Sequence, residues 1–235
     1  GFLRLLTASY KWEKAYDKRT AVERVNSRLD VSFHNGGRVK IGPDHKLYVT
    51  TGDAGDKANA QERQSLAGKI LRLALDGKVP ADNPFPHSYV FSYGHRNPQG
   101  LAWNEDGHLY SAEHGPTAHD EINRIVPGHN YGWPVITGGE TKKGLETPLF
   151  HSGDETWAPS GLSFADGKLY IAGLRGVQIR RFDLTHERSE RIFQGVGRLR
   201  DVWVDDRAIY VITNNRDGRG DPEQEDDRLL KLNLK

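Results

Sequence analysis

The sequence predicts an all-β protein with the architecture of a β-propeller, and the first observation behind this prediction is an internal repeat. The pattern Asp, two residues, Leu or Ile, then Tyr begins at Asp44, Asp106, Asp166 and Asp206, and its tyrosines lie 62, 60 and 40 residues apart. A repeating unit of about 40–60 residues that holds roughly four strands is typical of a propeller blade. The chain is therefore expected to contain four such blades.

The second observation is that short strand-like segments flank each repeat. An apolar segment precedes it and a segment of period-two alternation follows it, and both patterns predict antiparallel strands. The preceding segments are residues 36–41, 100–103, 160–164 and 201–204, and the following ones are residues 69–75, 121–126, 177–182 and 228–232. Asp-Gly pairs at residues 76–77, 106–107 and 166–167 predict hairpin turns, because glycine reaches positive φ without strain.

Two further segments complete the predicted architecture. Residues 2–6 resemble the last strand of an earlier unit, so the prediction is a propeller of four blades and part of another. Residues 58–66 predict one short helix. We expect residues 1–235 to form a single domain.

Composition excludes several classes of function. The formal net charge is +1, and positive and negative residues are mixed along the chain. The sequence has no block of basic residues that would indicate nucleic-acid binding. The absence of cysteine excludes disulfides and thiolate chemistry but leaves the compartment open. No apolar run reaches the roughly 18 residues that a membrane span needs. Residues 1–8 are too short and too interrupted for a signal peptide, and Met is absent, so we expect a processed or truncated start.

Polar residues at the strand starts predict a ligand site. The first strand of each propeller blade lines the central channel, so residues just before these strands are expected to converge on one face of the ring. They are His34, Arg96 with Asn97, Trp157, and Arg198 with Arg200. An aromatic ring, three arginines, an amide and an imidazole suit a flat, anionic ligand. The alternative is a generic propeller whose polar rim is simply solvated.

Seven ordered motifs, running from about residue 34 to the C-terminus, carry a resemblance to a known family. They are His34-Asn35-Gly36-Gly37-Arg38, Gly52-Asp53, Gly94-His95-Arg96-Asn97-Pro98-Gln99-Gly100, Glu113-His114-Gly115-Pro116, Asp120-Glu121-Ile122-Asn123, Asn130-Tyr131-Gly132-Trp133-Pro134 and Arg198-Leu199-Arg200-Asp201. Together they resemble the soluble PQQ-dependent aldose (glucose) dehydrogenases. The resemblance implies a propeller of the six-bladed type. It also implies that the family's N-terminal blades, which supply a Gln contact to the cofactor, are not in this chain.

The resemblance assigns three catalytic residues. His34 would be the base that takes the proton of the sugar C1 hydroxyl while hydride leaves C1. Asp53, which lies 19 residues further on, would be returned beside His34 by a hairpin and would hold its imidazole. Arg96 would stabilise the negative charge that develops on the quinone oxygen. The alternatives are a structural histidine in a Gly-rich turn and an aspartate that caps its own turn.

The resemblance also assigns cofactor contacts. Asn97 would hydrogen-bond PQQ, and Arg175 would be a cationic contact to it. Arg198 and Arg200 match the family's arginine pair, and arginine forks suit the three carboxylates of PQQ. Arg175 is a departure, because a relative carries Lys at this contact, so charge is kept and geometry changes. The alternative for Arg198 and Arg200 is a pair of alternate strand residues that face water.

Two Ca²⁺ sites follow from the same resemblance. The carbonyls of Gly115 and Pro116 would bind the ion that sits on the cofactor, because hard oxygen ligands suit Ca²⁺. The carboxylate of Glu121 and the carbonyl of Tyr131 would bind a second, structural ion. Without the resemblance, an Asp-Glu pair such as residues 120–121 usually marks a solvated turn.

The implied activity is oxidation of the C1 hydroxyl of aldoses to lactones with PQQ and Ca²⁺, with electrons passing to an external acceptor. The resemblance implies a periplasmic or secreted protein, a monomer or a homodimer. The alternatives are a propeller that binds without turnover and a Ca²⁺-dependent lactone hydrolase. Two departures leave the preferred sugar open. Phe33 stands where a relative has Asp, and only 22 residues separate Pro134 from Trp157, so the loop that shapes the sugar site is short.

Overall fold

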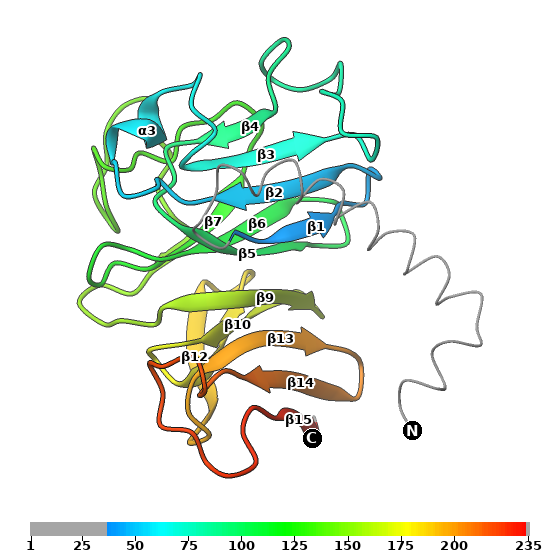
Figure 1. The fold of residues 1–235 in the computed structure, drawn as a ribbon, viewed down its shortest axis with the longest axis vertical. Coiled ribbons are helices and arrows are strands. Elements are labelled where there is room, and N and C mark those ends of the chain that lie inside the picture. Colours follow the sequence, from blue (N-terminus) through cyan, green and yellow to red (C-terminus); the bar gives the residue numbers. More distant parts are fainter. Residues whose placement is uncertain (1–36, 234–235) are drawn as a thin grey trace.

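Four antiparallel sheets make up the part of the chain that the computed structural model describes, residues 37–233 (Figure 1). Each sheet is a meander of consecutive strands. The first contains β1 (Val39–Ile41), β2 (Leu47–Thr51), β3 (Lys69–Leu73) and β4 (Val90–Tyr93). The second contains β5 (Pro98–Trp103), β6 (Leu109–Glu113), β7 (Glu121–Ile125) and β8 (Phe150–His151).

The other two sheets complete the described part. The third contains β9 (Pro159–Ala165), β10 (Lys168–Gly173), β11 (Gln178–Asp183) and β12 (Arg188–Gln194), and the fourth contains β13 (Leu199–Val204), β14 (Ala208–Thr213) and β15 (Leu229–Asn233). The four predicted repeats thus correspond to four sheets, and the all-β propeller prediction is confirmed. Residues 2–6, predicted as the end of an earlier unit, lie outside the described residues, as does His34.

The repeated motif forms the second strand of each sheet and the turn before it. Gly107 and Gly167 have φ of +81° and +70°, and Gly77, which leads out of β3, has +83°, so the predicted Asp-Gly turns are confirmed. The repeated tyrosines Tyr48 and Tyr110 are buried on β2 and β6. In the first repeat, Asp44 Oδ1 accepts the N–H of Lys46 at 3.1 Å and closes the turn, while Asp44 Oδ2 accepts the Tyr48 hydroxyl at 3.0 Å.

The predicted helix is shorter than the sequence indicates. α3 covers only Ala58–Gln61, and the chain turns to extended backbone at Glu62. The cause is Lys69, whose buried amine donates to the carbonyls of Asn59, Ala60 and Ala67 at 2.6–3.1 Å. Because these carbonyls converge on one ammonium group, the chain after α3 folds around Lys69 in place of continuing the helix.

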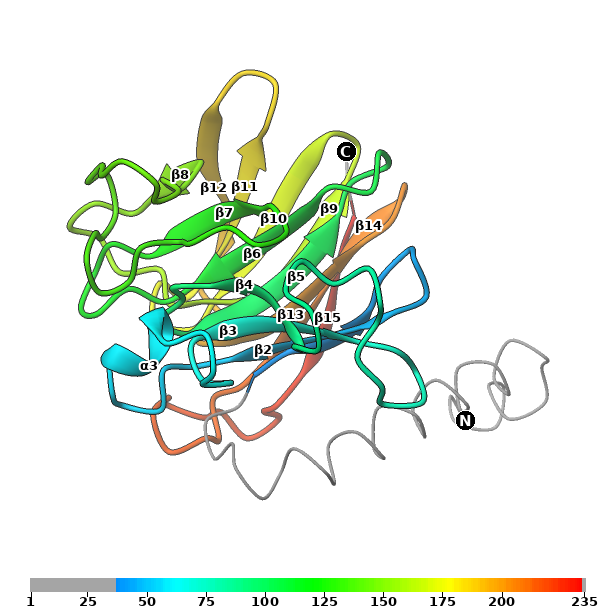
Figure 2. The ribbon, with the colours of Figure 1, turned by 90° about the horizontal axis from the view of Figure 1, so that it is seen from above.

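Apolar clusters fill the space between neighbouring sheets. One cluster joins the first and second sheets, the next joins the second and third, and another joins the third and fourth. The inner strands β5, β9 and β13 lie beside one another, and β8 and β12 lie at the outside (Figure 2). At Gly161 a Cβ atom would lie 1.8 Å from Asp201 Oδ1, so only glycine permits this approach of β9 to β13.

Candidate active site

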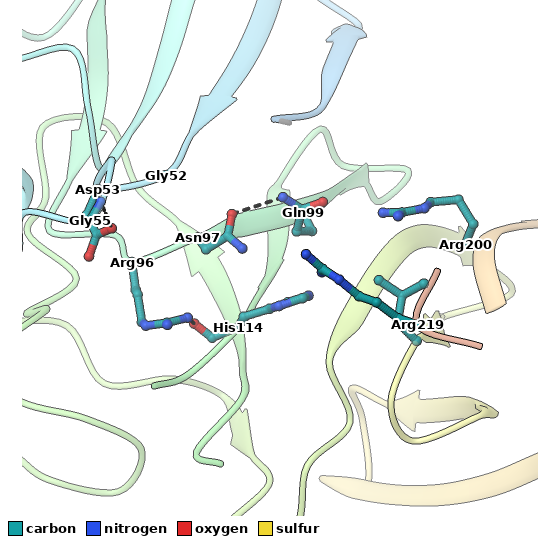
Figure 3. Close-up of a pocket in the computed structure, with 10 residues that line it drawn as sticks. Gly52, Asp53, Gly55, Arg96, Asn97, Gln99, His114, Arg200 and Arg219 are labelled. Carbon is teal, nitrogen blue, oxygen red and sulfur yellow. Dashed lines mark hydrogen bonds between the residues drawn. The ribbon is translucent and has the colours of Figure 1, made fainter. Parts of the chain in front are cut away.

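A polar cavity of about 520 Å³ lies where one edge of all four sheets converges (Figure 3). Its volume falls within the roughly 300–1,000 Å³ of small-molecule sites. The lining residues are Gly52, Asp53, Gly55, Arg96, Asn97, Gln99, His114, Leu174, Arg200 and Arg219. They come from the starts of first strands, the ends of second strands and the loop after β14. The structure therefore brings together four of the predicted site residues: Asp53, Arg96, Asn97 and Arg200.

Arg96 is held at the cavity by both its backbone and its side chain. Its N–H donates to Glu113 Oε1 at 3.3 Å, and its carbonyl accepts the N–H of Asp53 at 2.9 Å. Its Nη1 donates to the His114 carbonyl at 3.3 Å, and the guanidinium lies 5.6 Å from the ring centroid of Trp133. This combination of hydrogen bonds and a cation–π contact orients a permanent positive charge toward the cavity.

A buried chain of hydrogen bonds supports Arg96 from behind. Ser92 Oγ lies 2.8 Å from His95 Nε2, and His95 Nδ1 lies 2.9 Å from Glu113 Oε2. Ser92 and His95 are 0% exposed and Glu113 is 3% exposed. The order serine, imidazole, carboxylate matches a hydrolytic triad, but a substrate cannot reach the buried Ser92. The chain instead fixes the backbone at Arg96, a role that the sequence did not signal.

Asp53 has both of its carboxylate oxygens engaged. Oδ1 accepts the N–H of Gly55 at 3.0 Å. Asp53 therefore caps its own turn, which was the alternative to a catalytic role. Oδ2 accepts Trp133 Nε1 at 2.9 Å and faces the cavity edge. Its expected partner, His34, lies outside the described residues. The contact between Asp53 and His34 therefore stays a prediction.

Asn97 and Arg200 line opposite parts of the cavity. Asn97 Oδ1 accepts Gln99 Nε2 at 2.9 Å. Arg200 lies within β13, and its Nη1 is 3.3 Å from Ser160 Oγ. Burial lowers the pKa of Arg200, and the neighbouring Arg38 lowers it further. Burial and a neighbouring positive charge both disfavour the charged form of an arginine.

Arg198 and Arg175 do not line the cavity. Arg198 Nη2 forms an ion pair with Asp217 Oδ2 at 2.9 Å, and its Nη1 reaches the Leu174 carbonyl at 3.5 Å. Arg198 Nε is buried and has no hydrogen-bond partner within residues 37–233. Arg175 is exposed, and its neighbour Leu174 contacts the cavity in its place. The roles of both arginines toward a cofactor stay predictions.

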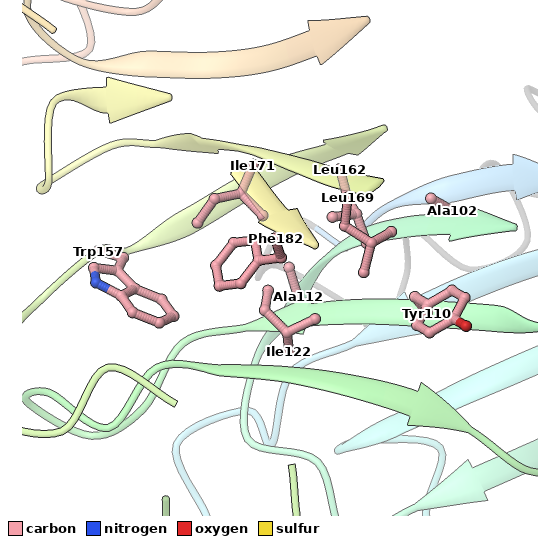
Figure 4. Close-up of a cluster of buried hydrophobic side chains, with 9 residues drawn as sticks. All are labelled: Ala102, Tyr110, Ala112, Ile122, Trp157, Leu162, Leu169, Ile171 and Phe182. Carbon is pink, nitrogen blue, oxygen red and sulfur yellow. The ribbon is translucent and has the colours of Figure 1, made fainter. Parts of the chain in front are cut away.

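The expectation that Trp157 faces the cavity is wrong. Its side chain is 3% exposed and belongs to the apolar cluster between the second and third sheets (Figure 4). There it packs against Phe182, with ring centroids 5.5 Å apart, and beneath the guanidinium of Arg180 at 4.9 Å. An aromatic residue gains more from core burial than from a polar rim, so its position before β9 misled the prediction.

Two of the lining residues that had no assigned role, His114 and Arg219, carry ionisable side chains. His114 lies at the end of β6, burial lowers its pKa, and its Nε2 has no hydrogen-bond partner in the described part of the chain. Arg219 comes from the loop between β14 and β15 and has an exposed side chain. His114 stands within the Glu113-to-Pro116 motif, which offered a signal. Arg219 lies in an irregular loop, which offered none.

The predicted cofactor-side metal ligands lie on a tightly held loop. Asp120 Oδ1 accepts the N–H of Gly115 at 2.9 Å, and Oδ2 accepts the N–H groups of Trp157 and Ala158 at 2.6 and 2.8 Å. Pro116 is exposed. Asp120 therefore shapes this loop. Within residues 37–233 no three His, Asp or Glu side chains cluster as metal ligands, and the predicted ligands here are carbonyls.

Glu121 is a buried carboxyl group in an unfavourable electrostatic environment. Burial, together with the charge of its cross-strand partner Glu113, raises its pKa to about 8. It accepts hydrogen bonds from the N–H of Gly138 at 2.8 Å and from Asn123 Nδ2 at 3.2 Å. Asn123 Oδ1 is buried and has no partner among the described residues. Two carboxyl groups and an unpaired amide oxygen suit a cation.

Tyr131, the other predicted ligand of the structural ion, has a structural side chain. Its hydroxyl donates to the Arg124 carbonyl at 2.6 Å and accepts the N–H of Val126 at 2.8 Å. Its ring stacks on His95 with centroids 4.8 Å apart. The prediction concerned its carbonyl, and that role stays a prediction.

Comparison with known proteins decides the family. The family model described as glucose/sorbosone dehydrogenase matches residues 4–230. The chain belongs to the glucose/sorbosone dehydrogenase family. The resemblance to quinoprotein sugar dehydrogenases is thereby confirmed.

Relatives of this family member include enzymes from three bacteria. The chain is 33% identical to aldose sugar dehydrogenase YliI of Escherichia coli over 87% of its own length and 63% of the relative's. It is 41% identical to quinoprotein glucose dehydrogenase B of Acinetobacter calcoaceticus over 47% of its length and 28% of the relative's. The solved PQQ-bound aldose sugar dehydrogenase of Streptomyces coelicolor is 44% identical, with a TM-score of 0.81 over 86% of this chain and 62% of that one. The chain thus spans less than two thirds of these relatives.

Proposed function

We propose that this protein oxidises the C1 hydroxyl of aldose sugars to lactones with PQQ as its cofactor. The observation that carries the proposal is the charge of the cavity. Arg96, Arg200 and Arg219 line it, and within residues 37–233 Asp53 is the only lining residue with a carboxylate. A cavity of this charge suits a flat ligand with several carboxylates. The similarity to a PQQ-bound aldose sugar dehydrogenase supports PQQ as that ligand.

The residues present fit PQQ. Arginine forks match carboxylate geometry, and buried polar atoms that lack partners are uncommon in folded proteins. His114 Nε2 and Arg198 Nε are such atoms beside the cavity. When bound, PQQ supplies the quinone that accepts the hydride. Asn97, Arg175, Arg198 and Arg200 are proposed to bind its polar edge.

The chain's own residues supply the remaining chemistry. His34 is proposed as the base for the C1 hydroxyl proton, with Asp53 orienting its imidazole. Arg96 presents a preorganised guanidinium to the oxygen on which negative charge develops. Its contacts with His114 and Trp133 support this role, because they hold the charge in place before any ligand arrives.

Two Ca²⁺ ions are part of the proposal. One would be held by the carbonyls of Gly115 and Pro116 and would act as a Lewis acid beside the cofactor. The other would be held by Glu121 and Tyr131. The buried Glu121 carboxyl and the unpaired Asn123 Oδ1 support a cation at this second position.

The wider setting is proposed from the family. The protein would pass electrons to an external acceptor, act in the periplasm or outside the cell, and exist as a monomer or homodimer. Residues 1–235 would form one propeller domain. Within residues 37–233, the structure contains no helix with the length and apolar character of a membrane span.

Reconstitution with cofactor tests the function. Purified protein is mixed with PQQ and Ca²⁺, an aldose is added, and the quinone absorbance and the reduction of a dye acceptor are followed. Bleaching of the quinone band with lactone formation supports the proposal. PQQ binding without bleaching would favour a binding propeller, and lactone hydrolysis independent of PQQ would favour a hydrolase.

A further inference from the structure

The loop between β14 and β15 is anchored on both sides of its tip. Asn215 Oδ1 accepts the N–H of Arg198 at 2.7 Å, and its Nδ2 donates to Asp226 Oδ2 at 2.9 Å. Arg216 donates to the carbonyls of Glu223 and Gln224 at 3.0 Å each, and also to the carbonyl of Asp226. These contacts hold the loop in one shape, so its tip is presented to the cavity without a cost of ordering.

Arg219 lies at this tip, and only its backbone has a hydrogen-bond partner among the described residues. Asp217 Oδ1 accepts the N–H of Arg219 at 3.0 Å, which closes the turn. Asp217 Oδ2 is already shared by Arg198 and by Asn214 Nδ2, at 2.9 and 2.8 Å. Within residues 37–233 the guanidinium of Arg219 makes no hydrogen bond and no ion pair. The nearby carboxylate thus neutralises Arg198 and leaves Arg219 free.

The free guanidinium lies inside the cavity. Arg219 and Arg200 occupy the end opposite Asp53, and the Arg219 side chain extends toward Asn97 and His114 (Figure 3). The guanidinium of Arg200 likewise forms no ion pair among the described residues, and its Nη1 lies 3.3 Å from Ser160 Oγ. Two guanidinium groups at one end of a cavity offer several N–H donors to an anion that enters there.

We propose that Arg219, together with Arg200, binds one carboxylate of the ligand in this cavity. The inference rests on the proposed function, because that carboxylate belongs to PQQ. Arg219 adds to the proposed cofactor contacts a guanidinium that pairs with no carboxylate among the described residues, whereas Arg198 is paired with Asp217. An arginine fork held on an anchored loop suits a carboxylate, which accepts two parallel N–H bonds.

The test compares the affinity of PQQ and of its trimethyl ester for the wild-type protein and for Arg219→Gln, in the presence of Ca²⁺. Loss of a charge-assisted contact should weaken PQQ binding by about 10- to 100-fold. It should weaken binding of the uncharged ester much less. Arg219→Lys should bind PQQ with an intermediate affinity, because it keeps the charge and loses the fork.

Arg207→Gln is the matched control, because Arg207 is exposed in the turn between β13 and β14, away from the cavity. It should bind PQQ as the wild type does. Equal affinity of Arg219→Gln and Arg207→Gln for PQQ would overturn the role of Arg219 alone. Failure of the wild-type protein to bind PQQ would overturn the proposed function and this inference with it.

Discussion

Glu113 Oε2 lies 2.9 Å from His95 Nδ1 in the interior, next to Arg96, whose guanidinium faces the cavity. Its other oxygen, Oε1, accepts the backbone N–H of Arg96. The Glu113 carboxylate thus links the buried imidazole of His95 to the backbone of Arg96 at the cavity. The position of Arg96 therefore depends on the interior of the second sheet as well as on its own side-chain contacts.

Glu113→Gln is expected to lower both stability and activity. The substitution keeps the shape of the side chain but removes the charge that accepts from His95 and Arg96. Loss of such buried hydrogen bonds costs about 1–3 kcal/mol in the free energy of unfolding, which urea denaturation measures. Ser111→Ala on the same strand is the control, because Ser111 Oγ is buried and unpartnered in the described residues. A loss no larger in Glu113→Gln than in Ser111→Ala would contradict the role of Glu113.

Lys69 should give stability an alkaline pH dependence. Burial lowers the pKa of Lys69 to about 8, while Glu62 acts in the opposite direction. The unfolded chain holds this proton more tightly, with the ordinary lysine pKa of 10.5. Protonation therefore opposes folding below pH 8, and stability is regained as the pH rises from about 8 to 10.5.

Lys69→Met isolates this effect, because methionine does not titrate. The free energy of unfolding of the wild type, relative to that of Lys69→Met, should rise across this pH window. The same comparison with Lys143→Met, at an exposed position, should give a difference that does not change with pH. If the difference in the free energy of unfolding between the wild type and Lys69→Met did not change with pH, the three carbonyls would stabilise the ammonium group as well as water does.

Much of this fold could be predicted from local patterns. The Asp-Gly turns, the buried tyrosines and the alternating strands are set by residues close in sequence, so the four sheets follow from the repeat. Arg96 and Asn97 were predicted to lie at the cavity because they precede a first strand, and the structure places both there. The contacts of Trp157 and Arg219 are different, because they depend on partners distant in the chain. Trp157 packs in the core because the neighbouring sheet offers it apolar partners. The pairing of Asp217 with Arg198 leaves the guanidinium of Arg219 without an ion pair among the described residues, and the sequence does not show this pairing.

Calcium is expected to stabilise the protein through Glu121. A cation offsets the cost of burying this carboxyl group beside Glu113, and binding only to the folded state raises the melting temperature. Thermal denaturation with Ca²⁺ and with excess chelator should therefore differ for the wild type. The difference should be lost in Glu121→Gln and kept in Asp206→Asn, whose side chain is exposed. An equal response of the wild type and Glu121→Gln would place the ion elsewhere.

Arg96→Lys should impair turnover more than folding. Lysine keeps a positive charge but lacks the guanidinium fork that reaches both the His114 carbonyl and the face of Trp133. Removing one preorganised charge from a site of developing negative charge typically lowers kcat by about 10²–10³-fold. The measurement is the rate of dye reduction with saturating PQQ, Ca²⁺ and aldose, alongside a urea melt of the same sample. Arg207→Lys should match the wild type in both. A rate for Arg96→Lys within about twofold of the wild type would mean that charge alone suffices, and that the geometry set by His114 and Trp133 does not contribute.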